Sequence, residues 1–244
     1  VLDFPTVWAA DADEYLHKGL EVHDQVRGNA LITAAFAPHA PYTVSNGPLE
    51  KVRMYAEELD VPIHMHVHET ADEVQQGITE HGKRPLERLA ALGLLSPQLA
   101  AVHMTQLERD EIERFAQYGG HVVHCPESNL KLASGFCPVE QLRDAGINVA
   151  LGTDGAASNN DLDMFGEMRT AALLAKAVAG DAAALPAADA LRMATLNAPP
   201  PLGLSPPTRS LDPPPAPHMA AVSPRAPGSP PTSPPSLIHS CSAP

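Results

Sequence analysis

The chain has 244 residues, with 16 Lys and Arg against 29 Asp and Glu, which gives a formal net charge of −13 at pH 7. This acidic balance argues against binding to nucleic acid or to an anionic membrane, because those surfaces require clustered Lys and Arg. Sixteen of the 26 prolines lie in residues 199–244, so we expect two unlike parts, a folded region over 1–198 and a Pro-rich tail over 199–244.

Short apolar runs alternate with segments of helical periodicity, which predicts βα units around a parallel sheet. The predicted strands cover residues 30–37, 61–67, 99–104, 121–125 and 148–153. The predicted helices cover residues 48–59, 106–118, 163–178 and 187–197, and another begins after Glu69, where Thr70 and Glu73 form a capping-box pattern. The folded region is long enough for a sizeable core but short for a complete (β/α)8 barrel, which takes about 250 residues.

Polar side chains follow the predicted strands, at or just beyond the carboxyl end of each one. They are His39, His66 with Glu69, His103, His124 and Asp154. In a parallel barrel the carboxyl ends of the strands form the catalytic face. Five successive units with this placement are hard to explain by packing alone, so we expect a single site there.

Three histidines alternate in the run PIHMHVHET. His64, His66 and His68 would share one face of a strand, which in a barrel is the interior. A histidine with a carboxylate three residues later fits a metal ligand and a proton-transfer group. For His64 and His68 taken singly, we favour the alternative of a hydrogen-bonded structural residue. For Asp154, followed by Gly155, an ordinary turn aspartate is the alternative.

Five motifs then occur in order along the chain: APHAPYT (37–43), HVHET (66–70), AVHMTQL (101–107), HCPESNLKLASG (124–135) and LGTDGAASNN (151–160). Over residues 1–198 this order resembles the amidohydrolase superfamily. Within it the chain is most similar to the 5-methylthioadenosine/S-adenosylhomocysteine deaminases, which are grouped with triazine chlorohydrolases and guanine deaminases. The resemblance implies an α/β fold with about the last five strands of a TIM-type barrel, followed by a Pro-rich tail in place of the family's small β-sandwich.

The resemblance also implies roles for the matched residues. His66 and Asp154 would ligate the catalytic metal, and Glu69 would move protons. His103 would polarise the attacked centre and contact the substrate, together with Glu69 and His39. Asp154 would also stabilise and orient the reacting groups.

A further loop matches the family at His124, Ser128 and Asn129, which we expect to shape the pocket. A purely structural role for His124 is an equal alternative.

The implied reaction is hydrolytic deamination of an adenine-type substrate, 5-methylthioadenosine or S-adenosylhomocysteine, to the inosine analogue and ammonia. The implied cofactor is one Zn²⁺ per active site, with Fe²⁺ or another divalent metal as alternatives, and the nucleophile is a hydroxide formed at the metal. The resemblance implies a homo-oligomer with a small nucleoside-type substrate. Cys125, Cys137 and Cys241 make an odd number without paired spacing, which favours the reducing cytoplasm over a disulfide scaffold, and no apolar run reaches the length of a membrane span.

The chain departs from the family pattern at both ends. No H-x-H pair precedes His39, although the family's first strand supplies two metal ligands there, so we expect a chain that lacks two barrel strands and most of a third. Such a chain would bind metal weakly or not at all by itself, because a catalytic zinc takes at least three protein ligands. The prolines after residue 198 are incompatible with a β-sandwich, since proline donates no ladder hydrogen bond.

Two alternatives stay open. One is another reaction of the same branch, as in guanine deaminases or triazine chlorohydrolases. The other is a non-catalytic barrel remnant whose proline-rich tail binds a partner.

Overall fold

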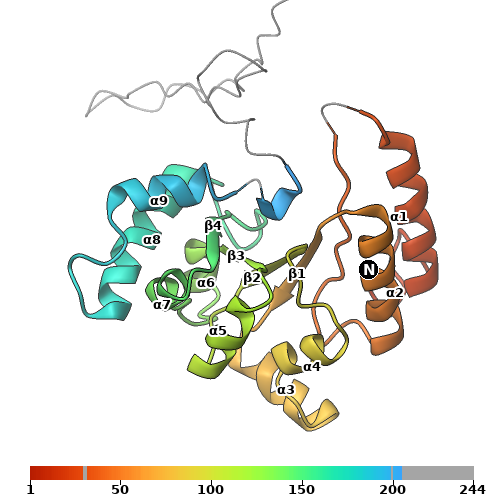
Figure 1. The fold of residues 1–244 in the computed structure, drawn as a ribbon, viewed down its shortest axis with the longest axis horizontal. Coiled ribbons are helices and arrows are strands. Elements are labelled where there is room, and N and C mark those ends of the chain that lie inside the picture. Colours follow the sequence, from red (N-terminus) through yellow and green to blue (C-terminus); the bar gives the residue numbers. More distant parts are fainter. Residues whose placement is uncertain (30–31, 199, 205–244) are drawn as a thin grey trace, which may run out of the picture. The chain divides into compact units, whose positions relative to one another are not determined.

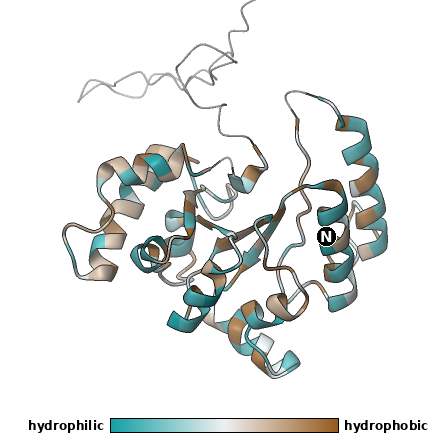
Figure 2. Ribbon diagram, viewed as in Figure 1, coloured by the Kyte–Doolittle hydropathy of each residue, from teal (hydrophilic) through white to brown (hydrophobic). Residues whose placement is uncertain are grey.

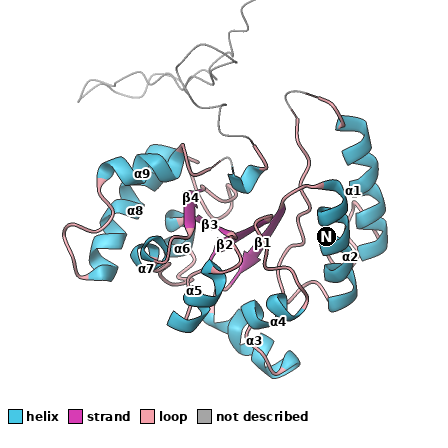
Figure 3. Ribbon diagram, in the orientation of Figure 1, coloured by secondary structure: helices cyan, strands magenta, loops and turns pink. Residues whose placement is uncertain are grey.

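A computed structural model describes residues 1–29, 32–198 and 200–204 (Figure 1). The described part is of the predicted α/β class, with parallel strands followed by helices (Figure 3). The expectation of an irregular tail in place of a β-sandwich falls mostly on residues 205–244, outside the described residues.

The strands of the described part form one parallel sheet in the order β1-β2-β3-β4. They are β1 (Ile63–Val67), β2 (Leu99–His103), β3 (His121–His124) and β4 (Asn148–Leu151). All four were predicted from the sequence. Because spatial order equals chain order, each crossover returns to the adjacent position, as in the wall of a (β/α)8 barrel.

The fifth predicted strand, residues 30–37, is not a full strand where the structure describes it. Within 32–37 only Phe36 pairs with the sheet, through one parallel bridge to Ile63. The amide of Phe36 donates to Pro62, and the amide of His64 donates to Phe36. The ladder stops there because the next donor position on this segment is Pro38, which has no N–H. Farther on, the amide of His66 donates to the carbonyl oxygen of His39.

The first residue of the chain lies on the other side of this segment. The backbone nitrogen of Val1 donates to the carbonyl oxygen of Ala37 at 2.6 Å, and the amide of His39 donates to the carbonyl oxygen of Val1 at 3.1 Å. This alternation has the form of a parallel ladder. It fixes the backbone of His39 from both sides.

Helices connect the strands. They are α1 (Ala12–Val26), α2 (Asn46–Leu59), α3 (Ala71–His81), α4 (Pro85–Ala91), α5 (Arg109–Ala116), α6 (Pro126–Lys131), α7 (Val139–Asp144), α8 (Met164–Ala179) and α9 (Ala187–Ala194), with a 3-10 turn η1 (Pro200–Leu202). The sequence pattern gave no bounds for α4, α6 and α7, which are only six or seven residues long. So few turns carry too little periodicity to detect.

Local capping residues explain where two of the predicted helices begin. The Thr70 hydroxyl accepts the amide of Glu73, which confirms that α3 starts just after Glu69. Helix α5 starts later than predicted, because Glu108 and Glu111 form a complete capping box ahead of Arg109.

The apolar core lies on one face of the sheet. Ile63, Met65 and Val67 of β1 are buried in it, together with Leu49 of α2 and Phe115 of α5. Figure 2 shows apolar residues concentrated along the strands and hydrophilic residues on the helices around them. Since side chains alternate along a strand, His64 and His66 lie on the face of β1 opposite the core, where both are half-buried.

Candidate active site

Three histidines and a carboxylate meet at the carboxyl ends of β1 and β2. The ring of His66 lies 5.1 Å from the ring of His39 and 5.2 Å from the ring of His103, measured between centroids. The Glu69 carboxylate Oε2 is 3.8 Å from Nε2 of His103. The structure therefore brings together four of the five residues that the motifs singled out.

The fifth, Asp154, reaches this group through α6. Ser128 of α6 donates its hydroxyl to Oδ2 of Asp154 at 2.7 Å, and the adjacent Asn129 bonds through Oδ1 to Nδ1 of His103 at 2.8 Å. Two neighbouring residues of one short helix thus hold two candidate residues from different strands. With the Asn129 side-chain oxygen accepting, Nδ1 of His103 is the donor of this hydrogen bond, and Nε2 faces Glu69.

The backbone is left-handed at three strand ends of this site. His68 (φ 54°) follows β1, His103 (φ 77°) ends β2, and Asp154 (φ 59°) follows β4. Non-glycine residues adopt this conformation only where the surrounding structure holds them, and such residues cluster at functional sites. At each of these residues the left-handed conformation turns the backbone away from the direction of the preceding strand.

His68 departs from the sequence prediction. The alternation had placed it on the same face as His64 and His66, but β1 ends at Val67 and the left-handed turn carries the ring to the other side. There Nε2 of His68 accepts the amide of Leu86 at 3.1 Å, and Nδ1 lies 3.7 Å from the Glu111 carboxylate. His68 is thus a structural residue.

His64 also makes a structural hydrogen bond. Its Nε2 is 2.7 Å from the carbonyl oxygen of Pro201 in η1. The alternative favoured for both histidines from the sequence is confirmed.

His66 and Asp154 differ in their charge state at pH 7. Burial, together with the neighbouring His103 and His39, lowers the pKa of His66 to about 4, so its ring is neutral at pH 7. Burial works against ionisation of Asp154, but hydrogen bonds from Ser158, Ser128 and the Gly155 amide hold its pKa below the ordinary value. The site thus pairs a neutral imidazole with an ionised carboxylate.

Two buried polar atoms beside this group have no hydrogen-bond partner among the described residues. They are Nδ1 of His124 and Nδ2 of Asn129. Burial lowers the pKa of His124 to about 3, which keeps its ring neutral.

The sequence did not identify Arg88 as part of the site's support. This buried guanidinium donates to the carbonyl oxygens of Pro41 and Val44 and to the Asn46 side chain. These contacts hold the loop that follows His39. No local pattern marks Arg88, because its partners lie more than 40 residues away in the chain.

Glu167 was missed as well, because no local pattern marks its partners, which lie 8 and 40 residues before it in the chain. It is fully buried and accepts hydrogen bonds from the Asn159 side chain at 2.6 Å and from the amide of Glu127 at 3.2 Å. Asn159 follows Ser158 and Glu127 precedes Ser128, so Glu167 ties together the two segments whose serines hold Asp154.

The buried Glu167 carboxyl should make the free energy of unfolding depend on pH. Burial raises its pKa to about 7 from the ordinary 4.5. Between these values the folded chain keeps a proton that the unfolded chain releases, so this group's contribution to stability falls as pH rises. Glu167→Gln cannot ionise, so the free energy of unfolding should fall less between pH 4.5 and pH 8 than in the wild type, by up to about 3 kcal/mol. Urea unfolding at the two pH values measures this, with the exposed Glu80→Gln as control, and an unchanged pH dependence would contradict it.

The described residues supply only part of a zinc site. His66 offers a neutral ring whose nitrogens make no hydrogen bond within the described residues, and Asp154 offers an ionised carboxylate, both suitable ligand types. A catalytic zinc takes at least three protein ligands. No group of three or more His, Cys, Asp or Glu in the described part of the chain is placed to hold a metal ion. These residues alone do not complete the site.

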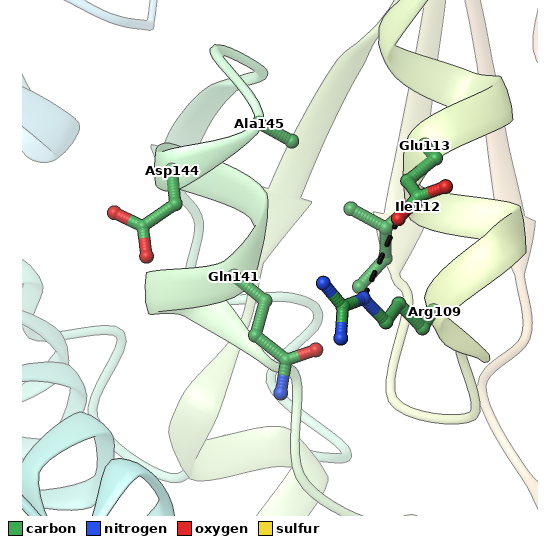
Figure 4. A pocket seen from close by; sticks show the side chains of 6 residues that line it. All are labelled: Arg109, Ile112, Glu113, Gln141, Asp144 and Ala145. Atoms are coloured by element: carbon green, nitrogen blue, oxygen red, sulfur yellow. Dashed lines mark ion pairs between the residues drawn. The ribbon is translucent and has the colours of Figure 1, made fainter.

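A separate surface groove lies between α5 and α7 (Figure 4). It is lined by Arg109, Ile112, Glu113, Gln141, Asp144 and Ala145. Arg109 and Glu113 form an exposed ion pair at 3.4 Å. None of the candidate site residues lines this groove. Among the described helices, none combines the length and apolar character needed to cross a membrane.

Comparison with known proteins gives a consistent match. The model of the amidohydrolase family matches residues 5–213. The 5-methylthioadenosine/S-adenosylhomocysteine deaminase of Teredinibacter turnerae is 54% identical over 213 residues, which cover 87% of this chain and 48% of the relative. The deaminase of the same name from Saccharophagus degradans is 56% identical over 204 residues, covering 84% and 46%. The chain thus spans about half the length of these curated relatives.

Solved structures agree. An adenosine deaminase from Xanthomonas campestris with bound zinc matches with a TM-score of 0.82 and 60% identity, over 83% of this chain and 46% of that one. Atrazine chlorohydrolase from Arthrobacter aurescens, complexed with zinc, matches with a TM-score of 0.77 and 27% identity, over 82% and 45%. These neighbours and the parallel sheet confirm the expected partial barrel. The chain belongs to the amidohydrolase family, as its five motifs predicted.

Proposed function

We propose that the whole protein containing this chain is a hydrolytic deaminase that converts 5-methylthioadenosine or S-adenosylhomocysteine to the inosine analogue and ammonia. The observation that carries this proposal is the convergence of His39, His66, Glu69 and His103 at one end of the sheet, with Glu69 3.8 Å from His103. The deaminases that are 54% and 56% identical support the substrate class.

In this reaction water adds to the ring carbon that bears the amino group, and the amino group leaves as ammonia. Glu69 is partly exposed beside His103 and takes the role of proton carrier. It takes a proton from the attacking water and passes it to the adjacent ring nitrogen. It then takes the proton of the new hydroxyl, which becomes the carbonyl of the product, and passes it to the amino group, which leaves as ammonia. His103, buried and held by Asn129, stabilises the charge that develops at the attacked centre.

His39 is the candidate substrate-binding residue at the open side of the histidine group. Its Nδ1 bonds to the Thr43 hydroxyl at 2.9 Å, which directs Nε2 away from its own loop. Burial lowers its pKa, so the ring is neutral at pH 7 and can accept or donate a hydrogen bond.

We infer that the whole protein uses a divalent metal, zinc in the first instance and one ion per site, with His66 and Asp154 as two of its ligands. Zinc is bound in the structures from Xanthomonas campestris and Arthrobacter aurescens. A bound divalent metal lowers the pKa of water toward neutrality. The remaining ligands come from outside the described residues.

We further propose a homo-oligomeric protein of the cytoplasm that takes a small nucleoside-type substrate and binds no nucleic acid. The net charge of −13 supports the last point. The free, buried thiols of Cys125 and Cys137 support a reducing compartment.

A substrate panel tests the proposed function. Purified whole protein is supplied with zinc and assayed for ammonia release from 5-methylthioadenosine, S-adenosylhomocysteine and guanine, and for chloride release from atrazine. We expect ammonia from the two adenine-type compounds only. Preferred turnover of guanine or atrazine would instead support a reaction like that of the guanine deaminases or triazine chlorohydrolases. A folded protein that neither binds metal nor turns over any substrate would support the non-catalytic alternative.

A further inference from the structure

A second carboxylate holds the turn that carries Glu69. The side chain of Glu73, in the first turn of α3, accepts the backbone amide of His68 on Oε1 at 2.9 Å and the backbone amide of Glu69 on Oε2 at 2.7 Å. Glu73 is only 4% exposed. One buried carboxylate therefore bridges two successive amides of the chain.

These two amides have no other partner among the described residues. They lie where β1 has ended and α3 has not begun, so neither the sheet ladder nor the helix can satisfy them. His68 is also left-handed, at φ 54°. Such a turn is retained only where its surroundings hold it.

The contact differs from an ordinary capping box. In that motif the carboxylate bonds to the amide of the capping residue, here Thr70. Glu73 instead reaches past Thr70 to the two preceding residues, while the Thr70 hydroxyl caps α3 through the Glu73 amide at 3.1 Å. The Glu73 carboxylate therefore holds the turn, and the Thr70 hydroxyl caps the helix.

The other side of the same turn is fixed from β2. The Thr105 hydroxyl donates to the carbonyl oxygen of Glu69 at 2.7 Å. The amide and the carbonyl of Glu69 are thus both held, one by Glu73 and one by Thr105. This leaves the Glu69 side chain free to face His103.

We propose that Glu73 is a positioning residue for proton transfer, which sets the direction of the Glu69 side chain by holding the two amides of its turn. This inference rests on the proposed function and adds a residue that acts through Glu69 without touching the substrate. Its carboxylate form is required, because two N–H donors need two acceptor oxygens.

The test is Glu73→Gln in the whole protein. The amide keeps the size of the carboxylate but places an N–H₂ group against one of the two backbone N–H donors, whichever way it is turned. We expect kcat for ammonia release to fall about 10-fold to 100-fold, with KM changed less than about threefold, since Glu73 itself does not contact the substrate and His39 and His103 are unchanged. The control is Asp72→Asn, which removes a carboxylate from the same first turn of α3 at an exposed position and should leave both constants unchanged.

A second readout does not depend on deamination. Hydrogen exchange of the amides of His68 and Glu69 should be faster in Glu73→Gln than in the wild type, and unchanged in Asp72→Asn. If the exchange rates change as expected while neither the wild type nor any variant releases ammonia, the proposed function is rejected. The role of Glu73 in holding the turn is then still supported.

Other outcomes overturn the proposal. A lower melting temperature with kcat and amide exchange unchanged would make Glu73 a merely structural residue. If Glu73→Gln does not fold, Glu73→Asp replaces it, because the shorter side chain keeps the charge but cannot span both amides. Failure of both variants to fold would assign Glu73 to the stability of the fold and reject a positioning role.

Discussion

Glu69→Gln in the whole protein is expected to lower kcat for ammonia release by about 10²-fold to 10⁴-fold, the range of a general acid-base group. Glutamine keeps the length of the side chain and its position near His103 but cannot carry a proton between water, ring nitrogen and leaving group. The fold should be unaffected, because the Glu69 carboxylate is partly exposed and lies near His103 without holding any other described element of the fold. Steady-state kinetics with 5-methylthioadenosine measures the effect.

Glu87→Gln is the matched control, since Glu87 is an exposed carboxylate on α4. It should have wild-type kcat. Activity of Glu69→Gln within about threefold of wild type would remove Glu69 from the reaction, since general acid-base groups contribute far more than this.

The second large effect is expected from His103→Asn, which should lower kcat about 10²-fold to 10³-fold, as loss of a group that stabilises developing charge does. Asparagine is chosen because it tolerates the left-handed backbone that His103 adopts at φ 77°. The variant loses the ring beside His66 and Glu69 while the turn is preserved.

His17→Asn provides the comparison for an exposed histidine on α1. It should leave kcat unchanged, and thermal unfolding of both variants checks that the fold is intact. Wild-type kcat in His103→Asn would show that the ring takes no part in catalysis.

Local chemistry explains which elements the sequence could predict. The strands β1 to β4 are short apolar runs, and the start of α3 is marked by Thr70 and Glu73, so both kinds of signal lie within a few residues. The same approach was wrong for a full strand over 32–37. A parallel ladder would need an N–H at position 62 to continue before Phe36 and an N–H at position 38 to continue after it, and both residues are prolines.

Some features of the candidate site could be predicted from the sequence, and others could not. Motif order located His39, His66, Glu69, His103 and Asp154, and the structure places them around one end of the sheet. Alternation alone placed His68 on the wrong face, because a left-handed turn after Val67 reverses its direction. Such a turn is determined by contacts made in the folded chain.

Residues that act at a distance in the sequence were beyond prediction. Arg88 bonds to a group 47 residues away and Glu167 to one 40 residues away, and nothing beside them in the chain indicates those partners. Glu73 was visible only as a capping residue, and its contact with the two amides before Thr70 emerges from the folded turn.

Hydrolytic deamination takes the new oxygen of the product from water, so an isotope label in the water reveals whether the reaction occurs. Whole protein supplied with zinc is incubated with 5-methylthioadenosine in water enriched in oxygen-18, and the product is analysed by mass spectrometry beside an ammonia assay. We expect one heavy oxygen in each product molecule and one ammonia released with it. Ammonia without heavy oxygen in the product, or no reaction by folded, zinc-loaded protein, would contradict it.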